Sequence, residues 1–221
     1  MKKILVMLVC AAMAFSVKAE DRFWGFSLTP QKQVPTVNDN VKGIRLGIYG
    51  EHFDVYGLDI CLGFAQIDHD LKGVSISICG NTVEGHATGA QVTIFKNNVE
   101  GDLWGVQDSW IWNRAVGKTI GAQVTIGFNE IYGDLRGAQI AWGASIAQNN
   151  AEIWGFQTAA YTQANTIHGV QFGILNFAKE VHGLQFGIVN KTEDMDGIQI
   201  GICNFIENSD LPFMIIVNAK F

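Results

Sequence analysis

Three stretches near the C-terminus decide the fold: GVQFGILN at residues 169–176, GLQFGIVN at 183–190 and GIQIGICN at 197–204. Each begins 14 residues after the one before it. All three share a leading glycine, a glutamine two positions later and a glycine four positions later. Self-similarity at a fixed short period is typical of repeat architectures. The sequence therefore predicts an array of structural repeats.

The same unit recurs toward the N-terminus at spacings of 14, 16 or 18 residues. Its leading glycine stands at Gly43, Gly57, Gly73, Gly89, Gly105, Gly121, Gly137, Gly155, Gly169, Gly183 and Gly197. A further copy begins at Leu211 without the glycine. Two positions after the glycine lies a polar row, our candidate site: Arg45, Asp59, Ser75, Gln91, Gln107, Gln123, Gln139, Gln157, Gln171, Gln185 and Gln199.

Apolar residues alternate with this polar row, as at Val170, Phe172 and Ile174. Alternation with a period of two predicts β-strands that have two unlike faces. One face carries glycine, glutamine and small residues, and the other carries valine, isoleucine, leucine and phenylalanine. Every spacing is even, which keeps each residue type on its own face because an odd insertion would exchange the two. Asp108 is the clear exception on the apolar face.

We expect an all-β fold in which the 14–18-residue repeats form an antiparallel meander, closed into a β-barrel of about 12 strands. In that barrel the apolar face contacts membrane lipid and the glutamines fill a narrow lumen. The alternative is a β-solenoid, in which each repeat is one coil. In that alternative we expect the apolar face inside and the glutamines stacked in a ladder outside.

The N-terminus is typical of a secretory signal peptide, because Lys2 and Lys3 precede an apolar run and Ala19 offers a small residue for cleavage. We expect a signal peptide at 1–19, an N-terminal lead-in with one strand at 20–42, and a single repeat β domain at 43–221. The signal peptide holds three lysines and no acid, so its removal changes the formal charge from −6 to −9. That charge argues against nucleic acid and anionic lipid as partners.

The repeats resemble a bacterial tandem surface-repeat family of the leptospiral type, with G-x-Q-x-G-x-x-N units. Two further segments are similar to that family: the opening FSLTP at 26–30 and the closing SDLPFMIIVN at 209–218. The resemblance covers nearly the whole chain after residue 19. It implies a location in the cell envelope and implies no reaction.

The chain contains none of the motifs for a serine nucleophile, a phosphate-binding loop or a zinc protease. We therefore expect no enzyme, no cofactor and no metal site. The cluster Asp68, His69 and Asp70 is interpreted as an ordinary charged turn. His168 and His182 both precede a leading glycine, so they would be lateral neighbours in parallel coils but lie at opposite ends of antiparallel strands.

Two pairs of residues carry more specific expectations. Arg45 and Asp59 occupy the polar row in adjacent repeats, which predicts an ion pair on that face. Cys61 and Cys79 offer one disulfide in an oxidising compartment, and the sequence leaves their pairing open.

The function that this pattern favours is a non-enzymatic envelope protein, structural or pore-like, in the outer membrane or on the cell surface of a Gram-negative bacterium. Outer-membrane lipid is the expected partner of the barrel, and no nucleic acid is expected. The alternative is a surface-exposed β-solenoid for adhesion or protein binding.

Overall fold

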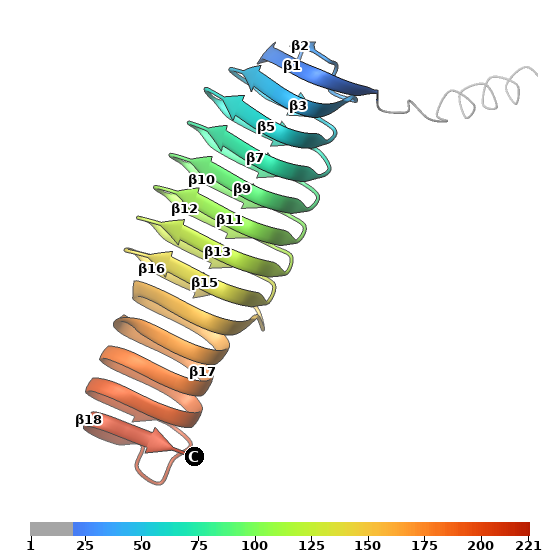
Figure 1. Cartoon of the computed structure of the whole chain (residues 1–221). Helices are drawn as coiled ribbons and strands as arrows, with labels where there is room; N and C mark the ends of the chain where they lie inside the picture. The colour runs from blue at the N-terminus through green and yellow to red at the C-terminus, as the bar shows by residue number, and fades with distance from the viewer. Residues whose placement is uncertain (1–19) are drawn as a thin grey trace, which may run out of the picture.

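The computed structural model describes residues 20–221; the predicted signal peptide lies outside the described residues. The described chain winds into an elongated β-solenoid (Figure 1). No helix among residues 20–221 has the length and apolar character needed to cross a membrane.

The solenoid begins with coils of two strands each. Its first sixteen strands are β1 (Asp21–Thr29), β2 (Lys32–Val34), β3 (Asn40–Gly47), β4 (Gly50–His52), β5 (Val55–Cys61), β6 (Phe64–Ile67), β7 (Leu71–Ser77), β8 (Gly80–Val83), β9 (Ala87–Thr93), β10 (Lys96–Val99), β11 (Leu103–Ser109), β12 (Trp112–Ala115), β13 (Thr119–Thr125), β14 (Phe128–Ile131), β15 (Leu135–Ala141) and β16 (Ala144–Ala147). β17 (Glu152–Ile206) then stays extended through several 14-residue coils, and β18 (Phe213–Lys220) ends the chain (Figure 1).

Neighbouring coils pair in parallel and in register. β11 pairs with β9 and β13, which places Gly105 beside Gly89 and Gly121. The short strands form a second wall, in which β12 pairs with β10 and β14. The antiparallel barrel prediction is therefore wrong and the solenoid alternative is correct. Each repeat holds a long strand and a connecting segment that returns the chain to its starting edge, so the next repeat runs in the same direction.

The leading glycine is required by this stacking. Gly105 has a φ of 146°, a conformation that side chains disfavour, and a Cβ there would lie 1.9 Å from the carbonyl oxygen of Gly89. Neighbouring coils are therefore too close at this corner for any residue with a side chain. The same arrangement recurs along the solenoid, which explains why the glycine row is the clearest part of the repeat.

The interior combines an apolar column with polar ones. Buried side chains stand two positions before each leading glycine and are apolar, as at Leu103 and Leu135, except for Thr119. Buried apolar side chains also stand at the end of the short strands, as at Val99 and Ile131. The residues that follow the glycine by two and four positions also point inward, as Gln107 and Ser109 do. The interior is thus a packed core with no lumen.

Different strand pairs close the two ends. At the N-terminal end, β1 runs parallel to β3, and β2 runs antiparallel to β1. The lead-in at 20–42 therefore holds two strands, and the start of a third, where we expected one. At the C-terminal end, β18 lies antiparallel to the last coil of β17, with Gly197 beside Lys220.

Candidate functional site

The polar row selected from the sequence lies inside the solenoid. All of its members are buried, from Arg45 to Gln199. From Gln107 onward, each glutamine donates its Nε2–H to the Oε1 of the glutamine in the preceding coil; Gln123 donates to Gln107 over 2.7 Å and accepts from Gln139 over 3.0 Å. The solenoid alternative placed this ladder outside, which is wrong. Stacked amides satisfy one another, so an amide column can replace an apolar one in the core.

A second amide ladder, which was not predicted from the sequence, runs along the facing wall. Asn97 donates to Asn113 over 3.0 Å, and Asn190 donates to Asn204 over 2.8 Å. These donors point to the following coil, whereas the glutamine donors point to the preceding one. Each asparagine Nδ2 also donates to a backbone carbonyl, as Asn97 does to Asp108, which fixes the orientation of the amide. The signal for this ladder is present in the sequence, because asparagines such as Asn97 recur eight positions after the glycine in several of the 16-residue repeats.

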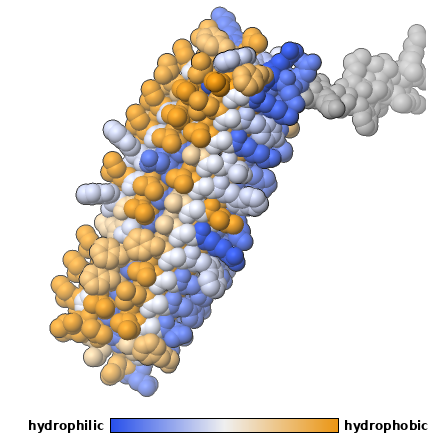
Figure 2. All heavy atoms as spheres, in the orientation of Figure 1, coloured by the Kyte–Doolittle hydropathy of each residue, from blue (hydrophilic) through white to orange (hydrophobic). Residues whose placement is uncertain are grey.

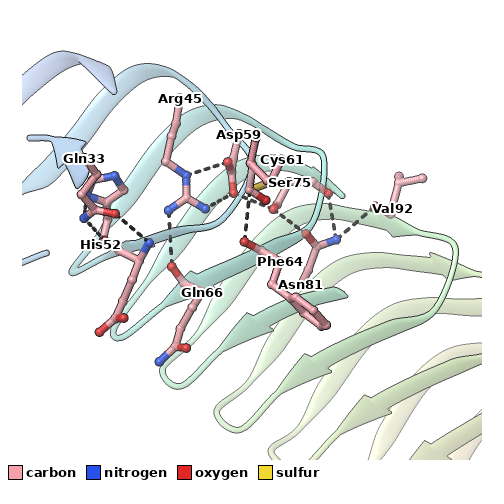
Figure 3. Close-up of polar contacts among 12 residues, drawn as sticks. Gln33, Arg45, His52, Asp59, Cys61, Phe64, Gln66, Ser75, Asn81 and Val92 are labelled. Carbon is pink, nitrogen blue, oxygen red and sulfur yellow. Dashed lines mark hydrogen bonds and ion pairs between the residues drawn. The ribbon is translucent and has the colours of Figure 1, made fainter. Parts of the chain in front are cut away.

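A buried ion pair replaces the amides in the first coils (Figure 3). Arg45 donates to both carboxylate oxygens of Asp59, from Nε over 2.6 Å and from a terminal nitrogen, which confirms the predicted pair. Ser75 donates its hydroxyl to Asp59 over 2.8 Å and so connects the pair to the next coil. Both charged groups are fully buried, so each depends on the other for its stability in the core.

His52 lies beside this pair and is also fully buried (Figure 3). Its Nδ1 lies 3.2 Å from the carbonyl oxygen of Thr36, and its Nε2 has no hydrogen-bond partner. Burial and the nearby charge of Arg45 lower the pKa of His52 to about 4. Gln33 of β2 connects to the strand of His52, because its Oε1 accepts the backbone N–H of Glu51 over 3.2 Å.

The charged turns cap the coils. The Oδ1 of Asp54 accepts the backbone N–H of Asp70 over 2.9 Å, and Asp70 in turn accepts the N–H of His86 over 3.0 Å. Asp54, His69 and Asp70 bring three ligand atoms within 4.8 Å of one another. The Asp54 and Asp70 carboxylates both accept backbone N–H groups of the following coil. This capping explains why the three residues lie close together.

Aromatic rings stack along one edge of the long strands. The ring centroids of His168 and His182 lie 4.7 Å apart, as parallel coils require, and Trp154 stacks on His168 at 3.8 Å. The three cysteines at 61, 79 and 203 are free, so the Cys61–Cys79 disulfide is absent. Burial raises the pKa of the Cys61 thiol.

The outward side of the long strands is apolar along the whole solenoid (Figure 2). We call it the outer apolar face and define it by the side chains one, three and five positions after each leading glycine. The third-position row is Leu46, Ile60, Ile76, Val92, Asp108, Val124, Ile140, Thr158, Phe172, Phe186 and Ile200. The fifth-position row is Ile48, Leu62, Ile78, Ile94, Trp110, Ile126, Trp142, Ala160, Ile174, Ile188 and Ile202. The barrel prediction also had these residues facing outward.

A groove of about 590 Å³ crosses this face at the Gly155 coil. Thr158 and Ala160 form its floor because they are smaller than the residues at the same positions in the coils on either side. Trp142, which is 82% exposed, stands on one side, and the stacked rings of Phe172 and Phe186 stand on the other, 5.3 Å apart.

These features define the chain as a β-solenoid with an amide core and an exposed apolar face. No family model matches it, and neither the curated proteins nor the solved structures contain a match.

Proposed function

We propose that this chain is an exported, non-enzymatic β-solenoid that binds other protein surfaces through its outer apolar face. The size of that face is the observation that carries the proposal. Positions one to five after the glycine span roughly 17 Å along the strand, and ten coils from Gly57 to Gly197 extend over roughly 48 Å. The face therefore covers about 800 Å², whereas the largest apolar patch on a typical monomer is about 300–600 Å².

The distribution of charge supports a protein partner over a lipid or nucleic acid. The formal charge of residues 20–221 is −9, which is unfavourable beside anionic lipid or phosphate. The outward positions of the second wall are mixed, with polar residues such as Glu130 and Gln163 beside aromatic ones such as Phe128. The continuous apolar surface is therefore on the long strands.

The interior supports a role without catalysis. The buried amides are hydrogen-bonded to one another, the Arg45–Asp59 pair is closed off from solvent, and the capping carboxylates hold backbone groups. Export is proposed from the N-terminal leader pattern, and a surface location from the resemblance to envelope repeat proteins. In this proposal the coils act as a scaffold that keeps the apolar rows flat and evenly spaced.

Photo-crosslinking from defined positions tests the proposal. A benzoylphenylalanine at Ile126 lies on the outer apolar face, and the same residue at Gln163 lies on the second wall as the matched control. In the native host, we expect a protein adduct from position 126 and none from position 163. Equal labelling from the two positions, or an adduct with lipid alone, would contradict a protein-binding face.

A further inference from the structure

We propose that the partner of the outer apolar face is a second copy of this chain, packed face to face with its solenoid axis antiparallel to the first. This inference rests on the proposed function and names the partner at that same surface. It is carried by two irregularities in the rows of that face.

The first irregularity is polar. Every residue of the third-position row is apolar except Asp108 and Thr158. Asp108 is exposed in the middle of the face, between Val92 and Val124 in the neighbouring coils. A carboxylate covered by an apolar surface would lose its water without compensation. Covering this face therefore requires a hydrogen-bond donor opposite Asp108, and the Thr158 hydroxyl is a donor in the same row.

The second irregularity is one of size. The fifth-position row has two tryptophans: Trp142 borders the groove of its own chain, whereas Trp110, which is 62% exposed, stands in the Gly105 coil. Ala160 is the smallest residue of the row and forms the floor of the groove in the Gly155 coil. Trp110 and Asp108 belong to one coil, and Ala160 and Thr158 belong to another. The two irregularities therefore occur as a matched pair of coils.

One symmetry operation brings both matches together. A two-fold axis that lies in the interface, parallel to the strands and between the Gly121 and Gly137 coils, exchanges the Gly105 and Gly155 coils and keeps each position along the strand. Trp110 of each copy then faces the groove over Ala160 of the other, and Asp108 faces Thr158. Any other register of this symmetry places Asp108 against an apolar residue or against its own copy.

The rest of the face is compatible with the same register. Val92 comes opposite Phe172, and Trp142 comes opposite Ile126, so both contacts are apolar. Ten coils of each copy overlap, so the contact covers about 1,600 Å² in total, which is the usual size of a specific, stable protein–protein interface. A two-fold interface of this kind is isologous, with the same patch on both subunits.

Sedimentation equilibrium of the purified chain tests the dimer at about 1 to 100 µM. We expect a dimer for the wild type. Ala160→Trp fills the groove and should raise the dissociation constant of the dimer at least about 30-fold. The swap Trp110→Ala with Ala160→Trp restores one large and one small residue at each contact and should recover the dimer. The control swap, Trp110→Ala with Ile174→Trp, keeps the number of tryptophans on the face and should not recover the dimer. Circular dichroism establishes that each variant is folded.

A wild-type chain that stays monomeric at all concentrations would overturn the inference, as would an equal effect of the two swaps. The crosslinking experiment tests the proposed function independently of the dimer. If position 126 crosslinks to a different protein while the chain is monomeric, the binding face stands and the dimer does not. If position 126 gives no adduct and the chain is monomeric, both fail.

Discussion

Replacing one glutamine in the middle of the ladder should destabilise the core far more than its size suggests. In Gln123→Leu, the Oε1 of Gln107 loses its donor and the Nε2 of Gln139 loses its acceptor. Both groups stay buried, and each unsatisfied buried group costs about 1–3 kcal/mol. The expected loss is therefore about 2–6 kcal/mol in the free energy of unfolding, measured by urea titration with far-ultraviolet circular dichroism.

The matched control is the same replacement at an exposed glutamine. Gln163→Leu loses only a contact with the Tyr161 hydroxyl and should change stability by about 0.5 kcal/mol or less. Adding Gln139→Leu to Gln123→Leu removes the orphaned Nε2 of Gln139, while the Nε2 of Gln157 loses one acceptor but keeps two backbone carbonyl acceptors. The double variant should therefore be no less stable than the single one. Equal losses at positions 123 and 163, or strictly additive losses at 123 and 139, would refute the idea that the ladder supports the core.

Three further predictions concern other parts of the solenoid. Asp59→Asn leaves the Arg45 charge buried without its partner and should cost about 3–5 kcal/mol in a urea titration, more than replacing both residues by leucine. His52 has a folded-state pKa of about 4 and an unfolded value near 6.5, so the unfolded chain binds the extra proton. Stability should be full above pH 6.5 and fall by about 3 kcal/mol toward pH 4, a slope that His52→Gln removes. Gly105→Ala should cost at least about 3 kcal/mol in a thermal melt, whereas Gly80→Ala, which has no strained φ, should cost less than about 1 kcal/mol.

The repeat, its strands and the two unlike faces could all be predicted from the sequence, because alternation and even spacing act locally. Alternation does not say which face is inside. Polar residues are usually exposed, and this preference led the solenoid alternative to place the glutamines outside. The structure reverses the preference because parallel, in-register coils bring identical amides to hydrogen-bonding distance, as at Gln107 and Gln123. That compensation between coils is invisible in a single repeat.

The direction of the strands could not be predicted from the core motif, since G-h-Q-h-G, with h apolar, reads the same both ways. The signal that distinguishes the two folds lies outside that motif. Asparagines such as Asn113 and Asn129 keep a fixed offset from the glycine, and a second constant row implies a second wall in every repeat. The ion pair between Arg45 and Asp59 was predictable because either architecture makes adjacent repeats neighbours.

The opposite directions of the two amide ladders have an electrostatic consequence. A column of hydrogen-bonded amides that all point the same way adds up its dipoles, as the peptide groups of a helix do. Such a column polarises its own members and accumulates opposite partial charges at its ends. Here the glutamine column donates toward the N-terminal end and the asparagine column toward the C-terminal end. Their fields largely cancel, so coils can be added to the array without building up a potential difference between its two ends.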